Sequence, residues 1–519
     1  MCCRLNGASQ KGTGLLKLVI KNLLPGLLIL ALVFTGRLSA QTLTTLHSFS
    51  GGAPNSAGSL TNSDGSGIGD LLLSGSTLYG TAYLGGLWGN GAIFALNIDG
   101  TGFRILHTFT ASSGYGPVAT YTNNDGARPN GGLLLSGSTL YGVASYGGLS
   151  GSGTVFALNT DGTGFKVLYN FTGFSDVTNG PTATNADGAI PNSCVIFSGS
   201  RLYGVAGLGG DSDRGTVYGL GMDGTDFSAL YSFTAPSPNA ATNSDGGWPF
   251  GRLVLSGDVL YGTAMRGGDW GNGTVFAVNK DGTFTNLHSF QGTNDGAVPL
   301  NGLLLSGSTL YGTTEYGGGT RGGSVFSGSG TVFRVMTNGS DYRTLYKFTA
   351  RTYTNSDGAA PVAGLTLSGN TLYGTAGLGG VWGSGTLFAL NIDGTGFSVL
   401  HSFAPGMTNS DGFAPFGRLT LSGNTLFGTT AYGGSSGNGT VFKISFTPQL
   451  SLTQFAEQIV LNWPTNYAGF DYTGYTLQST TNLDSPVWTT NLSAPVLVNG
   501  QNVVTNPISG TWQFFRLSK

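Results

Sequence analysis

A repeated aspartate has the clearest capacity for chemistry in this sequence. It occurs seven times, in Thr-Asn-x-Asp-Gly or Thr-Asn-Asp-Gly segments. Carboxylates gathered from several loops suit calcium, which takes roughly six to eight oxygen ligands. The same segment is also ordinary turn chemistry, in which Asn and Asp side chains bond nearby backbone. Two interpretations therefore stay open. The aspartates could form a calcium or polyhydroxylated-ligand site at the mouth of a ring of repeats, or they could be structural turn residues. The seven positions are Asp64, Asp125, Asp187, Asp245, Asp295, Asp357 and Asp411.

Aromatic residues on a glycine-rich loop form a second candidate site. Tryptophans occupy matching positions in three Gly-Gly-x-Trp-Gly segments, as Trp88, Trp270 and Trp382. Tyrosines precede the glycine pair in four repeats, as Tyr83, Tyr146, Tyr316 and Tyr432. Exposed rings on a rigid scaffold stack on sugars or anchor a protein partner. The alternative is packing between repeats, which we favour for the tyrosines and weigh equally for the tryptophans.

Catalytic groups are scarce. The four histidines, His47, His107, His288 and His401, stand where other repeats carry Tyr, which indicates a packing position. Glu315 and Glu457 are the only glutamates, so a paired-carboxylate glycosidase would have to use aspartates. A single active site would have to lie where the loops depart from the repeat, at Asp211, Asp213, Arg214, Glu315 and Arg321. We assign no catalytic residue and favour a non-enzymatic protein.

The composition of the chain limits the classes of partner that it could bind. Charged residues make up 9% of the 519 residues and the net charge is -2, so nucleic acid and anionic membranes are poor candidates. Residues 1–40 combine lysines, an apolar run from Leu23 to Phe34 and a small residue at Ala40, which predicts a signal peptide. We expect a secreted or cell-surface protein without a membrane span in the mature chain. Cys194 would then have no disulfide partner in that chain.

Four short β-type runs position these residues, and the set recurs seven times. The second run ends in Leu-Tyr-Gly or Leu-Phe-Gly, with its aromatic residue at Tyr79, Tyr141, Tyr203, Tyr261, Tyr311, Tyr373 and Phe427. The chain starts with a fourth-type run, Leu43–Phe49, and its last repeat stops after a third-type run, Gly439–Ser445. Pairing these two runs completes seven sheets. We therefore predict an all-β fold over residues 41–446, a seven-bladed β-propeller closed by its N-terminal strand, rather than a β-helix.

The connections within a repeat alternate in length. Ser-Gly-Ser and Asn-x-Asp-Gly-Thr segments are typical of hairpin turns. The Gly-Gly loop and the loop with the repeated aspartate are longer. Because alternate connections of an up-and-down sheet share a face, we expect all the long ones on one face, which would be the interaction surface.

The repeat resembles a known family. GTVFALNxDGTGFxxLxxF and DGAxPxGGLLLSGSTLYGTAxxGG are similar to the GloVer (Gloeo/Verruco) tandem repeat of exported bacterial proteins, over about Gln41 to Ser445. That resemblance implies export and supplies no catalytic residues. Residues 447–519 leave the repeat and predict a small β-sandwich, which resembles the fibronectin-type-III-like modules of secreted bacterial proteins.

These observations favour an exported, non-enzymatic scaffold that binds an extracellular polysaccharide or a surface protein through its long-loop face. A polysaccharide-cleaving enzyme on the same scaffold and a self-assembling surface-layer protein are the alternatives. We expect no cofactor unless the aspartates bind Ca²⁺. The oligomeric state stays open.

Overall fold

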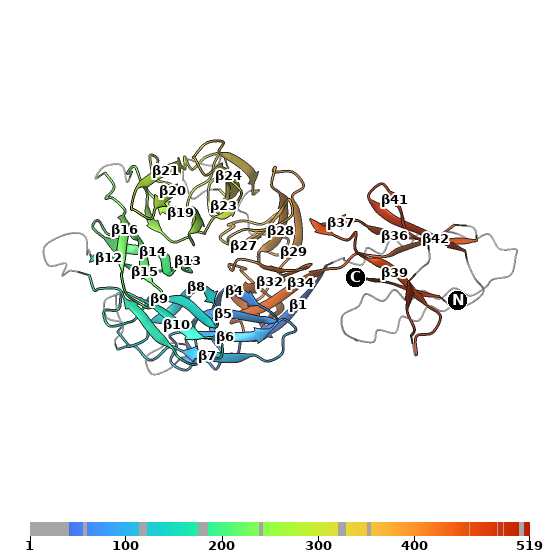
Figure 1. Ribbon diagram of the computed structural model, residues 1–519, viewed down its shortest axis with the longest axis horizontal. Coiled ribbons are helices and arrows are strands. Elements are labelled where there is room, and N and C mark those ends of the chain that lie inside the picture. The colour runs from blue at the N-terminus through green and yellow to red at the C-terminus, as the bar shows by residue number, and fades with distance from the viewer. Residues whose placement is uncertain are drawn as a thin grey trace. The chain divides into compact units, whose positions relative to one another are not determined.

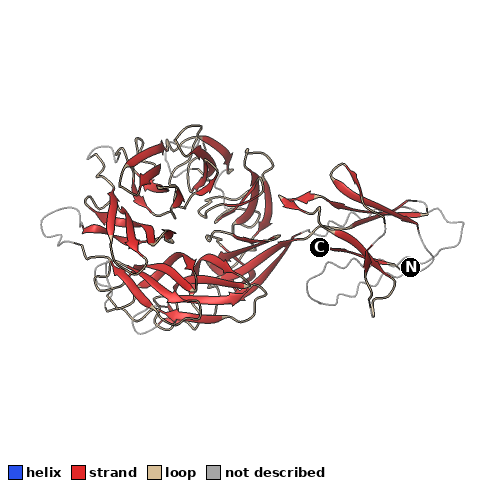
Figure 2. Cartoon of the chain, viewed as in Figure 1, coloured by secondary structure: helices blue, strands red, loops and turns tan. Residues whose placement is uncertain are grey.

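The computed structural model describes residues 41–54, 60–113, 122–174, 185–237, 242–319, 328–349, 354–455, 457–484, 486–490, 493–507 and 513–519. Strands, turns and loops make up these residues (Figure 2). They divide into two compact units, Leu43–Ile444 and a smaller unit of Ser445–Lys519 with Gln41 and Thr42. The predicted signal peptide, residues 1–40, lies outside the described residues. In the described part of the chain, no helix has the length and apolar character to span a membrane.

The larger unit is built from sheets that follow the sequence repeats and are largely four-stranded and antiparallel. The first contains β4 (Ser66–Ser74), β5 (Thr77–Leu84), β6 (Ala92–Asn97) and β7 (Arg104–Thr108). The second contains β8 (Ala127–Ser136), β9 (Thr139–Tyr146), β10 (Thr154–Asn159) and β11 (Lys166–Asn170). The third contains β12 (Asn185–Pro191), β13 (Ile196–Ser198), β14 (Arg201–Gly210), β15 (Thr216–Gly221) and β16 (Ser228–Ser232).

The later repeats give four more sheets. The fourth contains β17 (Gly247–Pro249), β18 (Val254–Ser256), β19 (Val259–Arg266), β20 (Thr274–Asn279) and β21 (Phe284–Ser289). The fifth contains β22 (Leu304–Ser306), β23 (Thr309–Thr314), β24 (Thr331–Met336) and β25 (Arg343–Lys347). The sixth contains β26 (Thr366–Ser368), β27 (Thr371–Ala376), β28 (Thr386–Asn391) and β29 (Ser398–Ser402). The seventh contains β31 (Thr420–Ser422), β32 (Thr425–Thr430), β34 (Thr440–Phe446) and β1 (Gln41–Ser48).

The seventh sheet joins the two ends of the larger unit. Its strand order is β1-β34-β32-β31, so the first described strand pairs with the last repeat. The Phe49 amide donates to the Gly439 carbonyl at 3.1 Å, the bond that the Phe109 amide makes with the Gly91 carbonyl in the first sheet. Within this unit the sheets follow one another around a common centre (Figure 1).

The Leu-Tyr-Gly motif reflects packing inside each sheet. A Cβ at Gly142 would lie only 2.5 Å from Cζ of Phe156, the buried ring of the neighbouring strand. The same arrangement holds for Gly262 beneath Phe276. Glycine is therefore required wherever the third strand places its ring over the second, and the residues that define the repeat also define its core.

Neighbouring sheets share their cores. One apolar cluster combines Ile93 and Phe109 of the first repeat with Leu133, Leu140 and Phe156 of the second. Another joins the two ends of the larger unit, bringing Phe49, Phe427 and Val441 against Ile68 and Leu78. Apolar burial thus holds each sheet against the next.

Two short strand pairs belong to the long connections. They are β2 (Ala53–Pro54) with β3 (Leu60–Thr61), and β30 (Asn409–Phe413) with β33 (Tyr432–Gly434).

The smaller unit has its own sheets and core. One sheet contains β35 (Ser451–Phe455), β36 (Gln458–Pro464), β42 (Gln501–Pro507) and β41 (Val496–Val498). A second contains β40 (Thr489–Thr490), β39 (Thr476–Thr480) and β43 (Phe514–Ser518), and β37 (Asn466–Tyr467) pairs with β38 (Phe470–Asp471). Leu461 and Trp463 of one sheet pack with Leu477 and Phe515 of the other, as in a sandwich.

Candidate functional site

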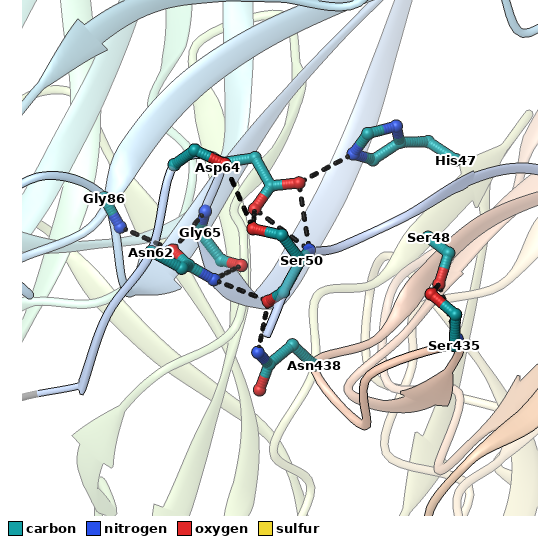
Figure 3. A network of polar contacts seen from close by, with 10 residues as sticks. His47, Ser48, Ser50, Asn62, Asp64, Gly65, Gly86, Ser435 and Asn438 are labelled. Carbon is teal, nitrogen blue, oxygen red and sulfur yellow. Dashed lines mark hydrogen bonds and ion pairs between the residues drawn. The ribbon is translucent and has the colours of Figure 1, made fainter. Parts of the chain in front are cut away.

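The two long connections of a repeat contact each other through the asparagine of the Thr-Asn-x-Asp-Gly segment. In the first repeat the Asn62 side chain accepts a hydrogen bond from the Gly86 amide at 2.9 Å and donates to the Gly65 carbonyl at 2.7 Å (Figure 3). Asn123 and Gly148 make the same contact at 2.9 Å. Both long connections of a repeat therefore lie at the same end of its sheet, as the alternation of loop lengths predicts.

The repeated aspartate points at an outermost strand. Asp64 accepts hydrogen bonds from Nε2 of His47 at 3.1 Å and from the Ser50 amide at 3.0 Å (Figure 3). His47 belongs to β1 of the seventh sheet, whereas Asp64 directly precedes β4 of the first. Every repeat has this carboxylate contact, through His47–Asp64, His107–Asp125, Tyr169–Asp187, Tyr231–Asp245, His288–Asp295, Tyr346–Asp357 and His401–Asp411. We call it the aspartate clamp.

The other side of the clamp is the aspartate backbone. The Asp245 carbonyl accepts a hydrogen bond from Oγ1 of Thr274, on the third strand of its own sheet, at 3.0 Å. The Asp187 carbonyl bonds Thr216 in the same way at 3.1 Å. Six of the seven aspartates thus fasten the outer strand of one sheet to the interior of the next, and in the first repeat Ala92 takes the place of the threonine.

The histidine and tyrosine of the clamp are interchangeable because both do two tasks. Each ring reaches the carboxylate, and every ring except that of His401 also stacks on an aromatic ring of the following sheet. His107 stacks on Phe165 with centroids 3.8 Å apart, and Tyr169 stacks on Phe227 at 4.0 Å. The sequence-based interpretation of this position as a packing site agrees with these contacts.

The surroundings of the seven aspartates are those of structural hydrogen-bond acceptors. Six of the seven are buried, and each carboxylate is already bonded by the end of an outer strand. Across the described residues, no group of three or more His, Cys, Asp or Glu side chains gathers as a metal site would require. Burial alone would raise the pKa of Asp64, but hydrogen bonds from His47 and Ser50 bring that pKa below its ordinary value. The carboxylate is held ionised as a structural acceptor.

The three tryptophans are exposed. The exposed fractions are 46% for Trp88, 60% for Trp270 and 51% for Trp382. Each sits at the tip of a turn closed by a bond between glycine backbones, such as the Gly271 amide to the Gly268 carbonyl at 3.2 Å. Gly268 and Gly271 have positive φ (78° and 76°), which explains the glycines of the motif. The loop backbone is thus ordered while the ring faces solvent.

The four tyrosines divide into two kinds. Tyr83 and Tyr146 are half-buried and both contact the Arg128 guanidinium, with ring centroids 5.7 and 5.1 Å from it. Tyr316 is half-buried, and its backbone pairs with that of Ala297. Tyr432 is 47% exposed and stacks on Phe413 at 5.1 Å. Tyr432 therefore resembles the tryptophans in presenting an accessible ring.

The irregular loop residues of the third repeat have structural partners. Asp213 has a φ of 55° and accepts a hydrogen bond from the Gly209 amide at 2.9 Å. Arg214 donates to the Asp213 carbonyl and lies over the Trp248 ring at 5.3 Å, while the Asp211 amide donates to Ser232. The Glu315 amide donates to the Val298 carbonyl, and Arg321 lies outside the described residues. These contacts do not bring the four described residues together.

Sequence reasoning overlooked one variable position. It directly precedes the Leu-x-Leu-Ser-Gly type run that begins each sheet, and most repeats have glycine or a small residue there. Its members are Asp70, Gly132, Cys194, Arg252, Gly302, Gly364 and Arg418. The signal was the departure from glycine to arginine within two identical Pro-Phe-Gly-Arg segments, at 249–252 and 415–418.

Comparisons with known proteins concern the fold and the repeat. No curated protein matches the sequence. Similar solved structures include an oligogalacturonate lyase from Vibrio parahaemolyticus, at 10% identity and a TM-score of 0.43, covering 78% of this chain and 97% of that one. They also include the β-propeller domain of the Trilobed protease from Pyrococcus furiosus, at 9% identity and a TM-score of 0.38, covering 70% and 91%. At these scores neither match bears on activity.

The family comparison covers most of the repeats. The Gloeobacter/Verrucomicrobia repeat matches residues 118–326 and 327–481, which is more than half of the sequence. The chain belongs to the Gloeobacter/Verrucomicrobia repeat family.

Proposed function

We propose that this chain is an exported, non-enzymatic scaffold that binds an extracellular glycan, or a surface protein that presents one, through its long-connection face. The observation that carries the proposal is the exposure of Trp88, Trp270 and Trp382 on ordered turns. Rings that only packed between repeats would be buried. An apolar ring held at the tip of a rigid loop loses little conformational entropy on stacking against a sugar.

The scaffold we propose is a closed, seven-bladed propeller. The pairing of β1 with β34 supports it, as do the contacts of the seventh sheet with the first. Thr420 donates to the Leu71 carbonyl at 2.6 Å, and Thr429 donates to the Gly69 carbonyl at 3.1 Å. Thr81 makes the equivalent contact with the Gly131 carbonyl between the first and second sheets.

The tryptophans occur in the first, fourth and sixth repeats. In a closed ring they would be distributed around one face instead of forming a single pocket. Such spacing suits an extended polymer or a surface with repeated ligands, which gains affinity from several weak contacts. We propose that the smaller unit is a fibronectin-type-III-like spacer, and that residues 1–40 direct export.

The test is a polysaccharide and glycan-array binding experiment with the purified protein, with and without calcium. Changing Trp88, Trp270 and Trp382 together to Ala is expected to weaken binding about tenfold or more, because each stacked ring contributes about 1 kcal/mol. Affinity is then measured by calorimetry on the best glycan.

Leu149→Ala is the matched control. Leu149 is 68% exposed on the Gly-Gly connection of the second repeat, which has no tryptophan, so this change removes apolar surface without removing a ring. It should leave the affinity unchanged. Full binding by the triple variant, or equal losses in both variants, would exclude stacking on the tryptophans.

A further inference from the structure

The variable position that precedes each first-type run forms a chain of contacts from repeat to repeat. Asp70 lies beside Gly132, where an added Cβ would be 3.0 Å from the Asp70 Cβ. Arg252 lies against Gly302 in the same way, with its Cβ 2.8 Å from that position. The Arg418 side chain passes Gly364, and its backbone amide donates to Oδ1 of Asp70 at 2.7 Å. The contacts thus lead from the last repeat back to the first.

We call these seven residues the inner ring. Asp70 and Gly132 lie within β4 and β8, and the other five lie two residues before β13, β18, β22, β26 and β31. Its charged members are Asp70, Arg252 and Arg418, and the other four positions are Gly or Cys. The inner ring therefore carries a net positive charge in a chain whose net charge is -2. Gly302 adjoins Arg252 and Gly364 adjoins Arg418, so a glycine lies next to each of the two arginines.

The arginines of the inner ring have hydrogen-bond donors without an acceptor among the described residues. Nε of Arg418 donates to the Leu365 carbonyl at 3.1 Å, but within the described residues its two Nη groups make no hydrogen bond. The Arg252 guanidinium makes no hydrogen bond or ion pair with any described side chain or backbone group. Asp70 is no salt-bridge partner of either, since no guanidinium nitrogen in the described chain lies within 4.0 Å of its carboxylate oxygens.

The charged groups of the inner ring nevertheless interact electrostatically. Burial lowers the pKa of Arg418, and the positive charge of Arg252 lowers it further, while Asp70 opposes both. Burial raises the pKa of the Cys194 thiol, which lies in the field of the same three residues. Two cations held close together and half-buried are costly unless an anion accompanies them.

A phenylalanine two residues before each arginine packs on a glycine of the preceding repeat. The Phe250 ring, two residues before Arg252, covers Gly207 of the preceding repeat, and the Phe416 ring covers Gly377 in the same way. Only the third and sixth repeats, which contain Gly207 and Gly377, read Ala-Gly-Leu-Gly-Gly before the long loop. The other repeats have a larger residue after Ala or Thr. The arginine segment and the glycine that accommodates it therefore occur together, twice.

The geometry points to an oxyanion site at the inner ring, in which Arg252 and Arg418 bind a carboxylate, phosphate or sulfate group. The planar guanidinium fork matches these groups, and the unused Nη donors are the ones that would face the ligand. Asp70 fixes the backbone of Arg418 and lowers the net positive charge of the site. The site is separate from the tryptophan face and does not depend on it.

The experiment titrates the purified protein with sulfate, phosphate and acetate by calorimetry, against chloride at equal ionic strength. Saturable binding of at least one oxyanion is expected, and the order of affinities identifies the source of the charge. Arg252→Gln should weaken that binding about tenfold or more, since a hydrogen bond to a charged group contributes about 1.5 to 3 kcal/mol. Arg418→Gln should act in the same direction.

Arg343→Gln is the control, because it removes one positive charge from an exposed arginine of the same unit. It should bind the oxyanion like wild type. Because the Arg252 side chain has no hydrogen bond to a described residue, Arg252→Gln should fold, and its melting curve checks this. Absence of saturable binding, or equal affinity in wild type and Arg252→Gln, would overturn the site. General stabilisation by sulfate that is the same in all variants counts as absence of binding.

Discussion

Asp245 has the lowest exposed fraction of the buried repeat aspartates, at 1%. Its carboxylate accepts hydrogen bonds from the Tyr231 hydroxyl and the Thr234 amide, both at 2.8 Å. Asp245→Ala would leave these buried donors without an acceptor and should lower the free energy of unfolding by about 3 kcal/mol. Urea unfolding followed by circular dichroism measures the change.

Asp223→Ala is the comparison for that variant. Asp223 accepts from Thr225 in an exposed hairpin turn, at 3.0 Å from its amide, so solvent can replace the bond. Its effect on stability should be much smaller. If the two variants unfold at the same urea concentration, the clamp contributes no more than a surface turn.

The clamp also predicts a loss of stability in acid. The pKa of Asp64 in the folded protein lies below the ordinary value of 3.8, so its contribution is complete above that value and is lost as the pH falls through the folded pKa. Asp64→Asn should be less stable than wild type at pH 6, and the difference should shrink below pH 4. Melting temperatures between pH 6 and 3 test this. Asp269→Asn, at an exposed loop position, should keep the wild-type profile, and a constant difference for Asp64→Asn would contradict the assignment.

At the level of elements, the packing of Phe250 on Gly207 should show strong coupling. A Cβ at Gly207 would overlap the Phe250 ring, so Gly207→Ala should destabilise the protein by about 1 to 3 kcal/mol. Phe250→Ala should relieve the overlap, and the double variant should be more stable than the sum of the two single changes implies. A double-mutant cycle in urea measures this coupling, and additive effects would exclude direct contact.

The strands and tight turns could be predicted because their determinants are adjacent in sequence. Thr101, for example, bonds Asp99 two residues away, within the Asn-x-Asp-Gly-Thr segment. The clamp could not be predicted in the same way, because its partners come from different sheets. His47 and Asp64 are 17 residues apart, and only their recurrence at matching positions in seven repeats could have linked them.

The inner ring was missed for a related reason. The internal repeat reveals residues that recur in all copies, whereas Arg252 and Arg418 depart from the repeat in only two copies. Their proximity depends on how the sheets are arranged around the centre, which no single repeat encodes. The exposure of Trp88, Trp270 and Trp382 was likewise open in the sequence, since a glycine-rich loop can fold over its own aromatic ring or present it.

For the whole larger unit, β1 should be essential. Removing residues 41–50 would leave the edge of β34 without its partner and would remove Phe49 from a fully buried position. We expect the shortened protein to lose cooperative unfolding and to associate through the exposed strand. Size-exclusion chromatography and calorimetry measure both effects.

A synthetic peptide of residues 41–50 provides the control. Added in excess, it should restore the elution volume of the full-length protein by occupying the vacant edge. A shortened protein that elutes and melts like the full-length protein without the peptide would show that the seventh sheet does not need β1, and would argue against the closed propeller.

The aspartate clamp has a consequence for how such a chain changes in length. Every repeat has a carboxylate at its start and a histidine or tyrosine near its end. A duplicated copy would therefore supply both partners of an aspartate clamp. Insertion or loss of one copy leaves each remaining junction chemically intact. The number of repeats could therefore change without a change in the contacts at each junction.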